Sequence, residues 1–119
     1  MKTKDDCIFC KIAAGDIPSE FIWSNEDVVA FHDMNPQAPV HVLIVPKYHS
    51  DNILTLASEA EGTQVFSQLL SAVPHVADAL GVSESGFRLI INTGKGGGQS
   101  VMHLHIHLLA GKGLSESIV

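Results

Sequence analysis

The sequence lacks the features that mark several classes of protein. It has only two cysteines among 119 residues, which excludes a small fold held together by several disulfides. No apolar run approaches the roughly 18 residues that cross a bilayer, and acidic residues near the start argue against a secretory signal. We therefore expect no membrane partner and a cytoplasmic location.

Positive charge is also scarce. Seven Lys and Arg residues stand against thirteen Asp and Glu residues, and the formal net charge is −6. Such a chain repels a phosphate polymer and offers no basic stripe, so no nucleic-acid partner is expected. A few backbone amides and neutral imidazoles can still bind a single phosphate group, so a small phosphate ester remains compatible with this charge.

The rest of the composition is that of a globular protein. Apolar residues make up 45% of the chain and charged residues 17%, and no low-complexity tract interrupts them. A length of 119 residues suits one core and is too short for two. We expect a single domain over residues 1–119, with no linker and no internal repeat.

The hydrophobic pattern predicts an α+β fold with helices packed on a mainly antiparallel sheet of five strands. A short helix should begin at Asp5 or Asp6, and a long helix should run from a capping box at Ser58 to Gly81, with a kink at Pro74. One predicted strand is apolar on both faces, so it should lie centrally in the sheet. The predicted strands cover residues 21–23, 28–31, 40–45 (the central one), 87–91 and 102–109.

The most informative segment is the last of these strands, in which histidine and apolar residues alternate strictly. That period of two is typical of a strand, so His103, His105 and His107 should share one face at intervals of ~6.6 Å. Histidine is a mediocre strand former, which makes an accidental row of three on an exposed face a poor explanation. The apolar residues between them should face the core, and they are Met102, Leu104, Ile106 and Leu108.

Two chemistries use such a row of histidines. Alternating histidines on a strand can supply two ligands of a catalytic zinc ion, with a third ligand from elsewhere. A neutral imidazole is also a competent nucleophile when an acceptor on its other ring nitrogen fixes the tautomer. The glycine-rich segment 92–100 favours the second chemistry, because its backbone amides can approach an anion, although glycines between strands more often just make a turn.

Two long motifs resemble a known family. The segment 97–109, GGQSVMHLHIHLL, resembles the signature of the histidine triad (HIT) nucleotide-binding proteins. FHDMNPQAPVH at 31–41, with VPK at 45–47, is similar to the Hint branch, the nucleoside phosphoramidases. The resemblance extends over residues 7–111 and implies a HIT-like fold and a homodimer whose sheet continues across the two-fold axis. It also implies hydrolysis of purine nucleoside 5′-phosphoramidates, such as lysine-linked AMP, to the nucleoside monophosphate.

The resemblance also implies roles for the residues around the phosphate. His105 matches the nucleophile that attacks the α-phosphorus and is transiently nucleotidylated. His107 matches a phosphate-contacting histidine, and His41 matches a residue that supports His107, although a lone histidine in an apolar strand is by default a hydrogen-bonded core residue. Nucleotidyltransferase relatives typically carry glutamine in place of His107, so histidine indicates hydrolysis. The other matching residues surround the α-phosphate and the leaving group: Asn92, Gly98, Gln99 and Ser100.

A nucleoside pocket is implied by the same resemblance. Asp33 should accept hydrogen bonds from both ribose hydroxyls, a role that suits a carboxylate with two acceptor oxygens. An apolar clamp should hold the base by stacking and shape, which discriminates poorly between purines. Core packing explains two of its members, Ile17 and Met34, equally well. The residues that match the clamp are Phe9, Ile17, His32 and Met34.

The spacing of the two cysteines, Cys7 and Cys10, suits two thiolates on one zinc ion. No second cysteine pair exists, so a zinc site would need histidines. In some bacterial HIT proteins and in the transferase relatives, such a pair binds structural zinc with two histidines, which match His49 and His103. A redox motif is less attractive because the pair does not follow a strand. We expect no cofactor for the chemistry itself and a structural Zn²⁺ as the one candidate ion.

Three functions therefore compete at this point. They are a nucleoside phosphoramidase, a nucleotide-binding scaffold with little turnover, and a zinc-dependent hydrolase that uses the histidine row as ligands. Dinucleoside polyphosphate hydrolysis is a nearer alternative within the family. It is disfavoured because the chain lacks the Pro-Arg pair that commonly follows the triad in that branch.

Overall fold

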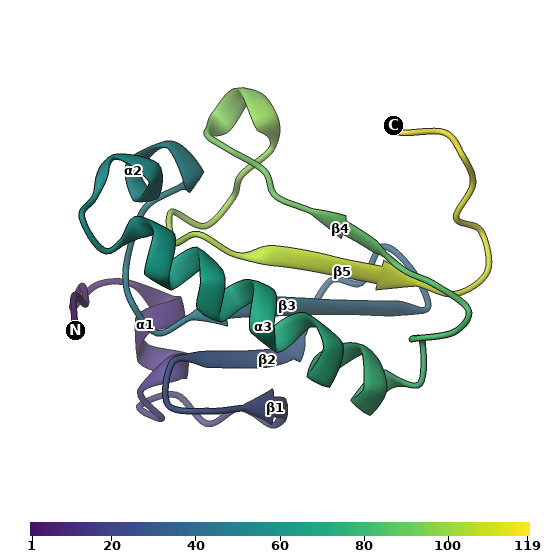
Figure 1. The fold of residues 1–119 in the computed structure, drawn as a ribbon, viewed down its shortest axis with the longest axis horizontal. Coiled ribbons are helices and arrows are strands. Elements are labelled where there is room, and N and C mark those ends of the chain that lie inside the picture. The colour runs from purple at the N-terminus through teal and green to yellow at the C-terminus, as the bar shows by residue number, and fades with distance from the viewer.

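The sheet of the computed structural model, which describes residues 1–119, has five strands that all pair antiparallel with their neighbours (Figure 1). Their order across the sheet is β1-β2-β3-β5-β4, so β3 is central and β4 forms one edge. The predicted α+β class and five-stranded antiparallel sheet are confirmed. The strands are β1 (Phe21–Ser24), β2 (Val28–His32), β3 (Val40–Pro46), β4 (Arg88–Ile90) and β5 (Ile106–Ala110).

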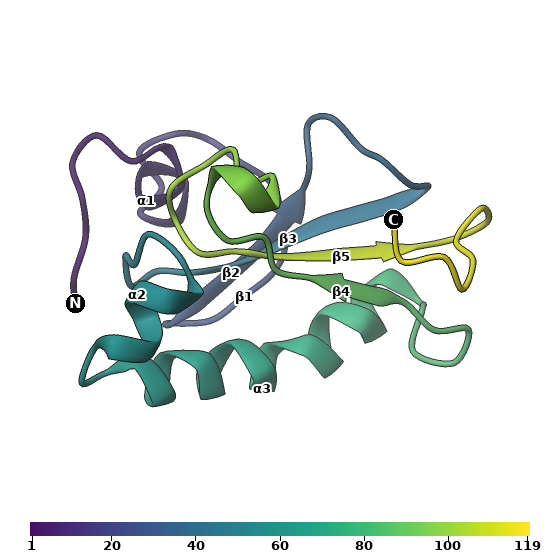
Figure 2. The same cartoon turned by 90° about the horizontal axis from the view of Figure 1, so that it is seen from above.

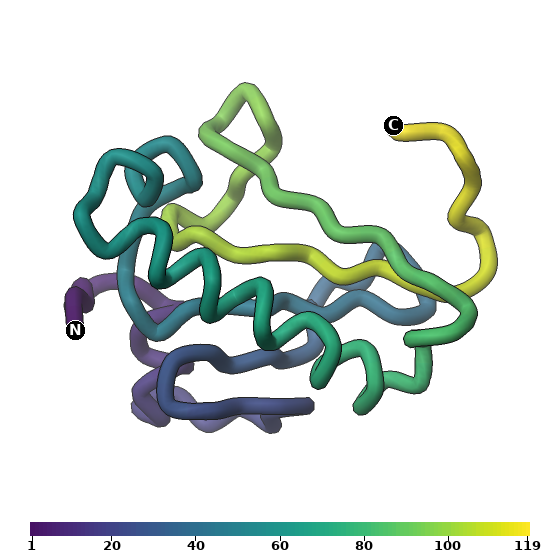
Figure 3. Tube along the Cα trace, in the orientation of Figure 1, coloured from purple at the N-terminus to yellow at the C-terminus, as the bar shows by residue number.

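Helices lie on both faces of this sheet. Seen from above, α3 runs across one face, whereas α1 and the loop that contains the short helix η1 lie on the other (Figure 2). The trace in Figure 3 shows the N-terminus near α1 and the C-terminal tail beyond the end of β5. None of the helices has the length and apolar character needed to cross a membrane. The helices are α1 (Ile8–Ala13), α2 (Ile53–Ser58), α3 (Gly62–Leu80) and η1 (Lys95–Gly97).

Alternation along the strands builds a hydrophobic cluster on each face. Val42 and Ile44 of β3 belong to the larger cluster under α3, whereas Leu43 and Val45 belong to the smaller cluster with Phe9 of α1. Side chains two residues apart share a face, so the side of the sheet that carries α1 also receives the odd-numbered residues of β3 and β5. The histidines of these strands therefore face α1.

The predicted starts of both helices are wrong. The first helix is capped by Cys7 rather than by Asp5 or Asp6, because the Cys7 Sγ accepts the Cys10 backbone N–H at 3.3 Å. The long helix begins at Gly62, because Ser58 instead ends a separate helix, α2. The apparent capping box thus marks the junction between two helices.

That junction requires a glycine. A Cβ atom on Gly62 would lie 2.0 Å from the Leu56 carbonyl oxygen, so no other residue fits this close turn. The far end of α3 is as predicted, because Gly81 caps it in the left-handed conformation with φ of 71°. Pro74 lies inside α3, and the kink expected there stays a prediction.

The last strand is shorter than predicted, which changes the histidine row. β5 begins only at Ile106, so Met102 is 43% exposed rather than in the core, and the Leu104 N–H donates to the Ser50 carbonyl at 2.7 Å. Leu104, Ile106 and Leu108 are buried under α3 as expected. Because His103 precedes the strand and is fully buried, the three imidazoles do not line one open surface.

Candidate active site and metal-binding cluster

His105 lies just before β5, beneath the ring of Phe9. Its Nδ1 atom is 2.7 Å from the His103 carbonyl oxygen, so Nδ1 carries the proton and donates it. The lone pair is then on Nε2, which makes no hydrogen bond within the protein. Burial lowers the pKa of His105 below its ordinary value, with the bond to the His103 carbonyl opposing it. The ring is therefore neutral at neutral pH and has one free nucleophilic nitrogen.

A chain of hydrogen bonds fixes the proton on His107. The Gln37 backbone N–H donates to Nδ1 of His41 at 2.9 Å, so the proton of His41 is on Nε2. That Nε2–H lies 2.8 Å from Nδ1 of His107, which must accept it. His107 then carries its own proton on Nε2, and its ring centre is 4.9 Å from that of His105. No sequence motif indicates the part played by Gln37, because its contribution is a backbone N–H.

Electrostatics keep His107 uncharged. Burial, followed by the neighbouring His105 and His41, lowers the pKa of His107 to about 4, while Asp33 opposes the shift. At neutral pH this side chain is therefore a neutral hydrogen-bond donor. It offers one directed N–H group beside the nucleophilic nitrogen.

Asp33 follows β2 and lies close to this chain of histidines. Its Oδ2 atom is 3.4 Å from Nε2 of His41, and its Oδ1 atom accepts the Asn35 backbone N–H at 2.8 Å. The side chain keeps 21% exposure, so its remaining lone pairs face solvent. A carboxylate in this position can accept hydrogen bonds from a ligand without losing its contacts within the protein.

The four residues expected to clamp a base lie in different environments. Phe9 is buried and packs edge-on against Phe31, with ring centres 5.7 Å apart. Ile17 is half-buried, whereas His32 is exposed and Met34 is fully exposed. The ring of Phe9 also packs edge-on against that of His105, at 5.1 Å between centres. The clamp formed by all four stays a prediction.

The glycine-rich loop is held from behind by Gln99. This side chain is buried, and its Oε1 accepts the Gly94 N–H at 2.8 Å while its Nε2 donates to the Asp51 and Val101 carbonyls at 2.6 and 2.9 Å. Gln99 therefore shapes the loop, a role that the sequence did not reveal. The other loop residues expected near the phosphate are less enclosed: Asn92 is half-buried, and Gly98 and Ser100 are exposed.

The four residues expected to bind zinc converge at one buried point. The sulfur atoms of Cys7 and Cys10 and the Nδ1 atoms of His49 and His103 all lie within 4.8 Å of one another. Nδ1 of His103 is 3.3 Å from the Cys7 Sγ, 3.5 Å from the Cys10 Sγ and 3.1 Å from Nδ1 of His49. Ligands on a tetrahedral zinc ion are separated by roughly 3.3–3.8 Å, so these atoms are spaced for one metal ion.

The outer hydrogen bonds of this Cys/His cluster show that its chemistry fits a cation. Nε2 of His103 donates to the Pro46 carbonyl and Nε2 of His49 donates to the Asp51 carboxylate, both at 2.8 Å. Each ring therefore directs an unprotonated Nδ1 inward, as metal-bound histidines do. Two such acceptors 3.1 Å apart need a positive charge or a hydrogen-bond donor between them, and a metal cation bound by all four ligand atoms supplies that charge.

The two cysteines agree with this interpretation. Burial raises the pKa of the Cys10 thiol to about 11, so a thiolate at this place needs a metal ion to stabilise it. The cluster has four ligand atoms and no open position, which is typical of a structural rather than a catalytic site. A catalytic zinc bound by the histidine row would use His103, but His103 belongs to this closed cluster instead.

Comparison with known proteins agrees with the fold and the motifs. The HIT domain family matches residues 14–114 of the chain. The chain belongs to the HIT family. Among curated HIT relatives, Protein HitA of Neisseria gonorrhoeae is 46% identical over 105 residues, which cover 88% of this chain and 95% of that protein. The purine nucleoside phosphoramidase of Escherichia coli strain K12 is 38% identical over 114 residues, covering 96% and 94%.

Solved HIT structures match over almost the whole chain. A histidine triad protein from Clostridium difficile has a TM-score of 0.89 and 43% identity, and the match covers 97% of this chain and 98% of that one. A HIT family hydrolase from Clostridium thermocellum has a TM-score of 0.90 and 42% identity, covering 98% and 100%. The HIT-like fold expected from the two sequence motifs is therefore confirmed.

Proposed function

We propose that this HIT protein hydrolyses purine nucleoside 5′-phosphoramidates, with His105 as the nucleophile. The observation that carries the proposal is the hydrogen bond from Nδ1 of His105 to the His103 carbonyl, which leaves Nε2 unprotonated and free. The name of the Escherichia coli relative, purine nucleoside phosphoramidase, supports the substrate class. The membership of the HIT family supports a site for nucleotides.

The reaction has two displacements at phosphorus. Nε2 of His105 attacks the α-phosphorus, the phosphorus–nitrogen bond to the leaving amine breaks, and the amine takes up a proton from solvent as it departs. Water then attacks the same phosphorus and gives up a proton to solvent, the bond to Nε2 breaks, and the nucleoside monophosphate leaves with neutral His105 restored. Two inversions predict net retention of configuration at phosphorus.

The residues around His105 stabilise charge more than they transfer protons. The Nε2–H of His107 is directed by the chain through His41, so it can donate to a non-bridging phosphate oxygen as negative charge builds. Exposed Ser100 supplies hydrogen-bond donors near the phosphate and the leaving group, whereas the Gly98 N–H already donates to the Lys95 carbonyl and shapes the loop from within. Asp33, which lies beside His41, takes the ribose hydroxyls.

The test compares release of AMP from adenosine 5′-phosphoramidate by three proteins. The wild type should turn over, and His105→Ala should lose on the order of 10⁴-fold in kcat/KM because the first displacement has no nucleophile. His75→Ala is the matched control, because His75 is exposed and stacks on Trp23, away from the site. Equal rates for the wild type and His105→Ala would leave the protein as a nucleotide-binding scaffold.

We also propose that the Cys/His cluster binds a structural Zn²⁺. Its support is the inward direction of two unprotonated Nδ1 atoms beside two buried cysteines. A bound ion would stabilise the two thiolates and fix the N-terminal helix to the segments that carry His49 and His103. No step of the phosphorus chemistry requires it.

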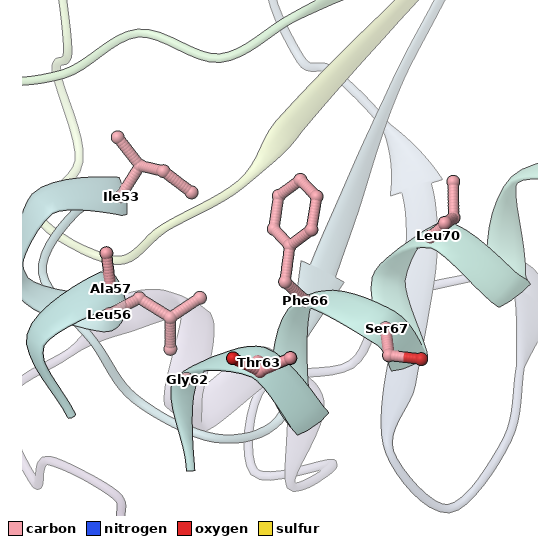
Figure 4. A pocket seen from close by; sticks show the side chains of 8 residues that line it. All are labelled: Ile53, Leu56, Ala57, Gly62, Thr63, Phe66, Ser67 and Leu70. Carbon is pink, nitrogen blue, oxygen red and sulfur yellow. The ribbon is translucent and has the colours of Figure 1, made fainter. Parts of the chain in front are cut away.

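We propose, finally, a homodimer in which a free strand edge and an apolar cavity meet a second copy. β4 pairs only with β5, so its outer edge has unpaired backbone groups. Between α2 and α3 lies a cavity of about 410 Å³, into which Ile53, Phe66 and Leu70 project (Figure 4). Leu70 is 64% exposed at the edge of this mainly apolar lining, so a second copy seated here would bury a contiguous apolar surface.

Oligomeric state tests the dimer proposal directly. The wild type should sediment with the mass of two chains, and Leu70→Glu should give one chain because it places a charge on the apolar surface. Gln64→Glu is the control, since it puts the same charge on an exposed position of α3 outside the cavity lining. A monomeric wild type, or a dimeric Leu70→Glu, would contradict the proposed interface.

A further inference from the structure

The side chain of Gln99 has no hydrogen-bond donor left for a phosphate ligand. Its amide oxygen accepts from Gly94, and its amide nitrogen donates both of its protons, to the carbonyls of Asp51 and Val101. The residue is 6% exposed. Its backbone N–H also bonds within the loop, to the Gly94 carbonyl at 3.0 Å. Gln99 thus holds the two ends of the glycine-rich loop together and connects the loop to the segment that contains Asp51.

Asp51 connects Gln99 to the Cys/His cluster. The Asp51 carbonyl accepts from Gln99, while its carboxylate accepts the Nε2–H of His49 at 2.8 Å. A continuous series of hydrogen bonds therefore joins His49, Asp51, Gln99 and Gly94. It starts at an inward-facing ligand of the cluster and ends at the first glycine of the loop expected to surround the phosphate.

We propose that Gln99 is a positioning residue that couples metal occupancy of the Cys/His cluster to the order of the glycine-rich loop. A cation in the cluster would bind Nδ1 of His49; without it this atom has only the weaker contacts with the Cys10 sulfur at 3.4 Å and Nδ1 of His103 at 3.1 Å, so we expect His49 to be held less firmly. Asp51 holds His49 and also holds Gln99, so both move together. The inference rests on the metal site proposed above, and it is independent of which substrate the protein hydrolyses.

A second connection does not pass through Gln99. The His103 carbonyl accepts from Nδ1 of His105, so the cluster also touches the nucleophile directly. A change at Gln99 should therefore disturb the loop and leave the orientation of His105 in place. This difference separates the role of Gln99 from a general loosening of the protein.

The test is amide hydrogen exchange at Gly94 in zinc-loaded and chelator-stripped protein. In the wild type, stripping should speed exchange at Gly94 about tenfold while an amide at the centre of β3 stays protected. Gln99→Met, which keeps the volume and removes the hydrogen bonds, should bind zinc but exchange equally fast in both states. Lys95→Ala, an exposed change in the same loop, should behave as the wild type.

Asp51→Ala provides a second variant in case Gln99→Met does not fold. It keeps the carbonyl that holds Gln99 and removes only the contact with His49, so the zinc dependence at Gly94 should shrink to about twofold or less. An unchanged Gly94 rate on stripping the wild type would overturn the inference, as would equal acceleration in β3. Persistence of the zinc effect in Gln99→Met would overturn it too. Failure of the wild type to bind zinc would remove the metal site and this inference, whereas lack of phosphoramidase activity would remove only the proposed reaction.

Discussion

The protein has two groups of histidines: the cluster group, with His49 and His103, and the reactive group, with His105 and His107. His103 and His105 come from the same short segment but differ in what their second ring nitrogen can do. His103 has both nitrogens committed, one to the Pro46 carbonyl and one to the Cys/His cluster. His105 has one nitrogen committed, to the His103 carbonyl, and one free. Identical side chains two residues apart therefore acquire different chemistry, because a backbone carbonyl binds Nε2 of His103 but Nδ1 of His105.

Burial alone does not separate the two groups. His103 is fully buried and His105 is 6% exposed, and desolvation lowers the pKa of both. Both rings are therefore neutral near neutral pH, the state that suits a metal ligand and a nucleophile alike. The distinguishing feature is the set of neighbours, which are two cysteines around His103 and the chain through His107 around His105.

The largest effect should come from removing a ligand of the Cys/His cluster. Cys10→Ser should purify with little or no zinc, whereas the wild type and His75→Ala should contain one zinc per chain, as the four converging atoms require. Metal analysis of the purified proteins measures this. Equal zinc contents in the wild type and Cys10→Ser, or no zinc in either, would contradict the proposal that the Cys/His cluster binds a metal ion.

Replacing His107 should slow the reaction at His105 and leave zinc binding by the Cys/His cluster unchanged. His107→Ala removes the N–H directed by His41, so kcat/KM for adenosine 5′-phosphoramidate should fall about 10²- to 10³-fold, the range for loss of one charge-stabilising donor. Its zinc content should match that of the wild type. A rate within about threefold of the wild type, or a loss of zinc, would show that the two groups are not separate in this way.

A smaller effect is expected from the outer contact of the cluster. Asp51→Ala should weaken zinc binding about 10- to 100-fold, because the carboxylate fixes the tautomer and direction of His49. Competition with a chromogenic chelator measures the affinity. Glu84→Ala, an exposed acidic residue elsewhere, is the control. An unchanged affinity in Asp51→Ala would mean that His49 is positioned by packing alone.

The smallest effect is a pH dependence of stability that comes from His107. Its pKa is held at about 4 in the folded protein, below the ordinary value of 6.5, so the unfolded chain binds more protons between these values. The free energy of unfolding should therefore fall as pH decreases from about 6.5 to 4, by about 1–2 kcal/mol from this group once solvent screening is allowed for. Urea unfolding of the wild type and of His107→Gln isolates the contribution. Identical pH profiles for the two proteins would contradict it.

The sequence predicted the sheet well because its strands carry strong local signals. β3 is an apolar run that only a central strand explains, and β1 and β2 surround a polar turn. The predicted start of α3 was wrong because Ser58 and Glu61 fit a capping box but have other roles. Ser58 ends α2, and the Glu61 carboxylate accepts a hydrogen bond from the Tyr48 hydroxyl at 2.8 Å. Tertiary contacts decided this boundary, and such contacts are invisible in a local pattern.

For the site, the sequence identified the residue types but not their partners. The motifs selected His105 and His107, and the cysteine spacing with the family resemblance selected the four residues of the Cys/His cluster, which the structure brings together. Strict alternation suggested one continuous row, yet β5 begins after His105, so His103 is free to turn toward the cysteines. The acceptors that settle each tautomer are mostly backbone atoms, such as the carbonyls of His103 and Pro46, which no side-chain motif encodes.

Trapping of the covalent intermediate tests the central claim most directly. The wild type is mixed with adenosine 5′-phosphoramidate and quenched in alkali, because a phosphorus–nitrogen bond to imidazole is labile in acid, and its peptides are mapped by mass spectrometry. One nucleotidyl group should be found on His105, and none should be found on any peptide of His105→Ala. A nucleotidyl group on a different residue, or AMP release by His105→Ala at the wild-type rate, would contradict the account.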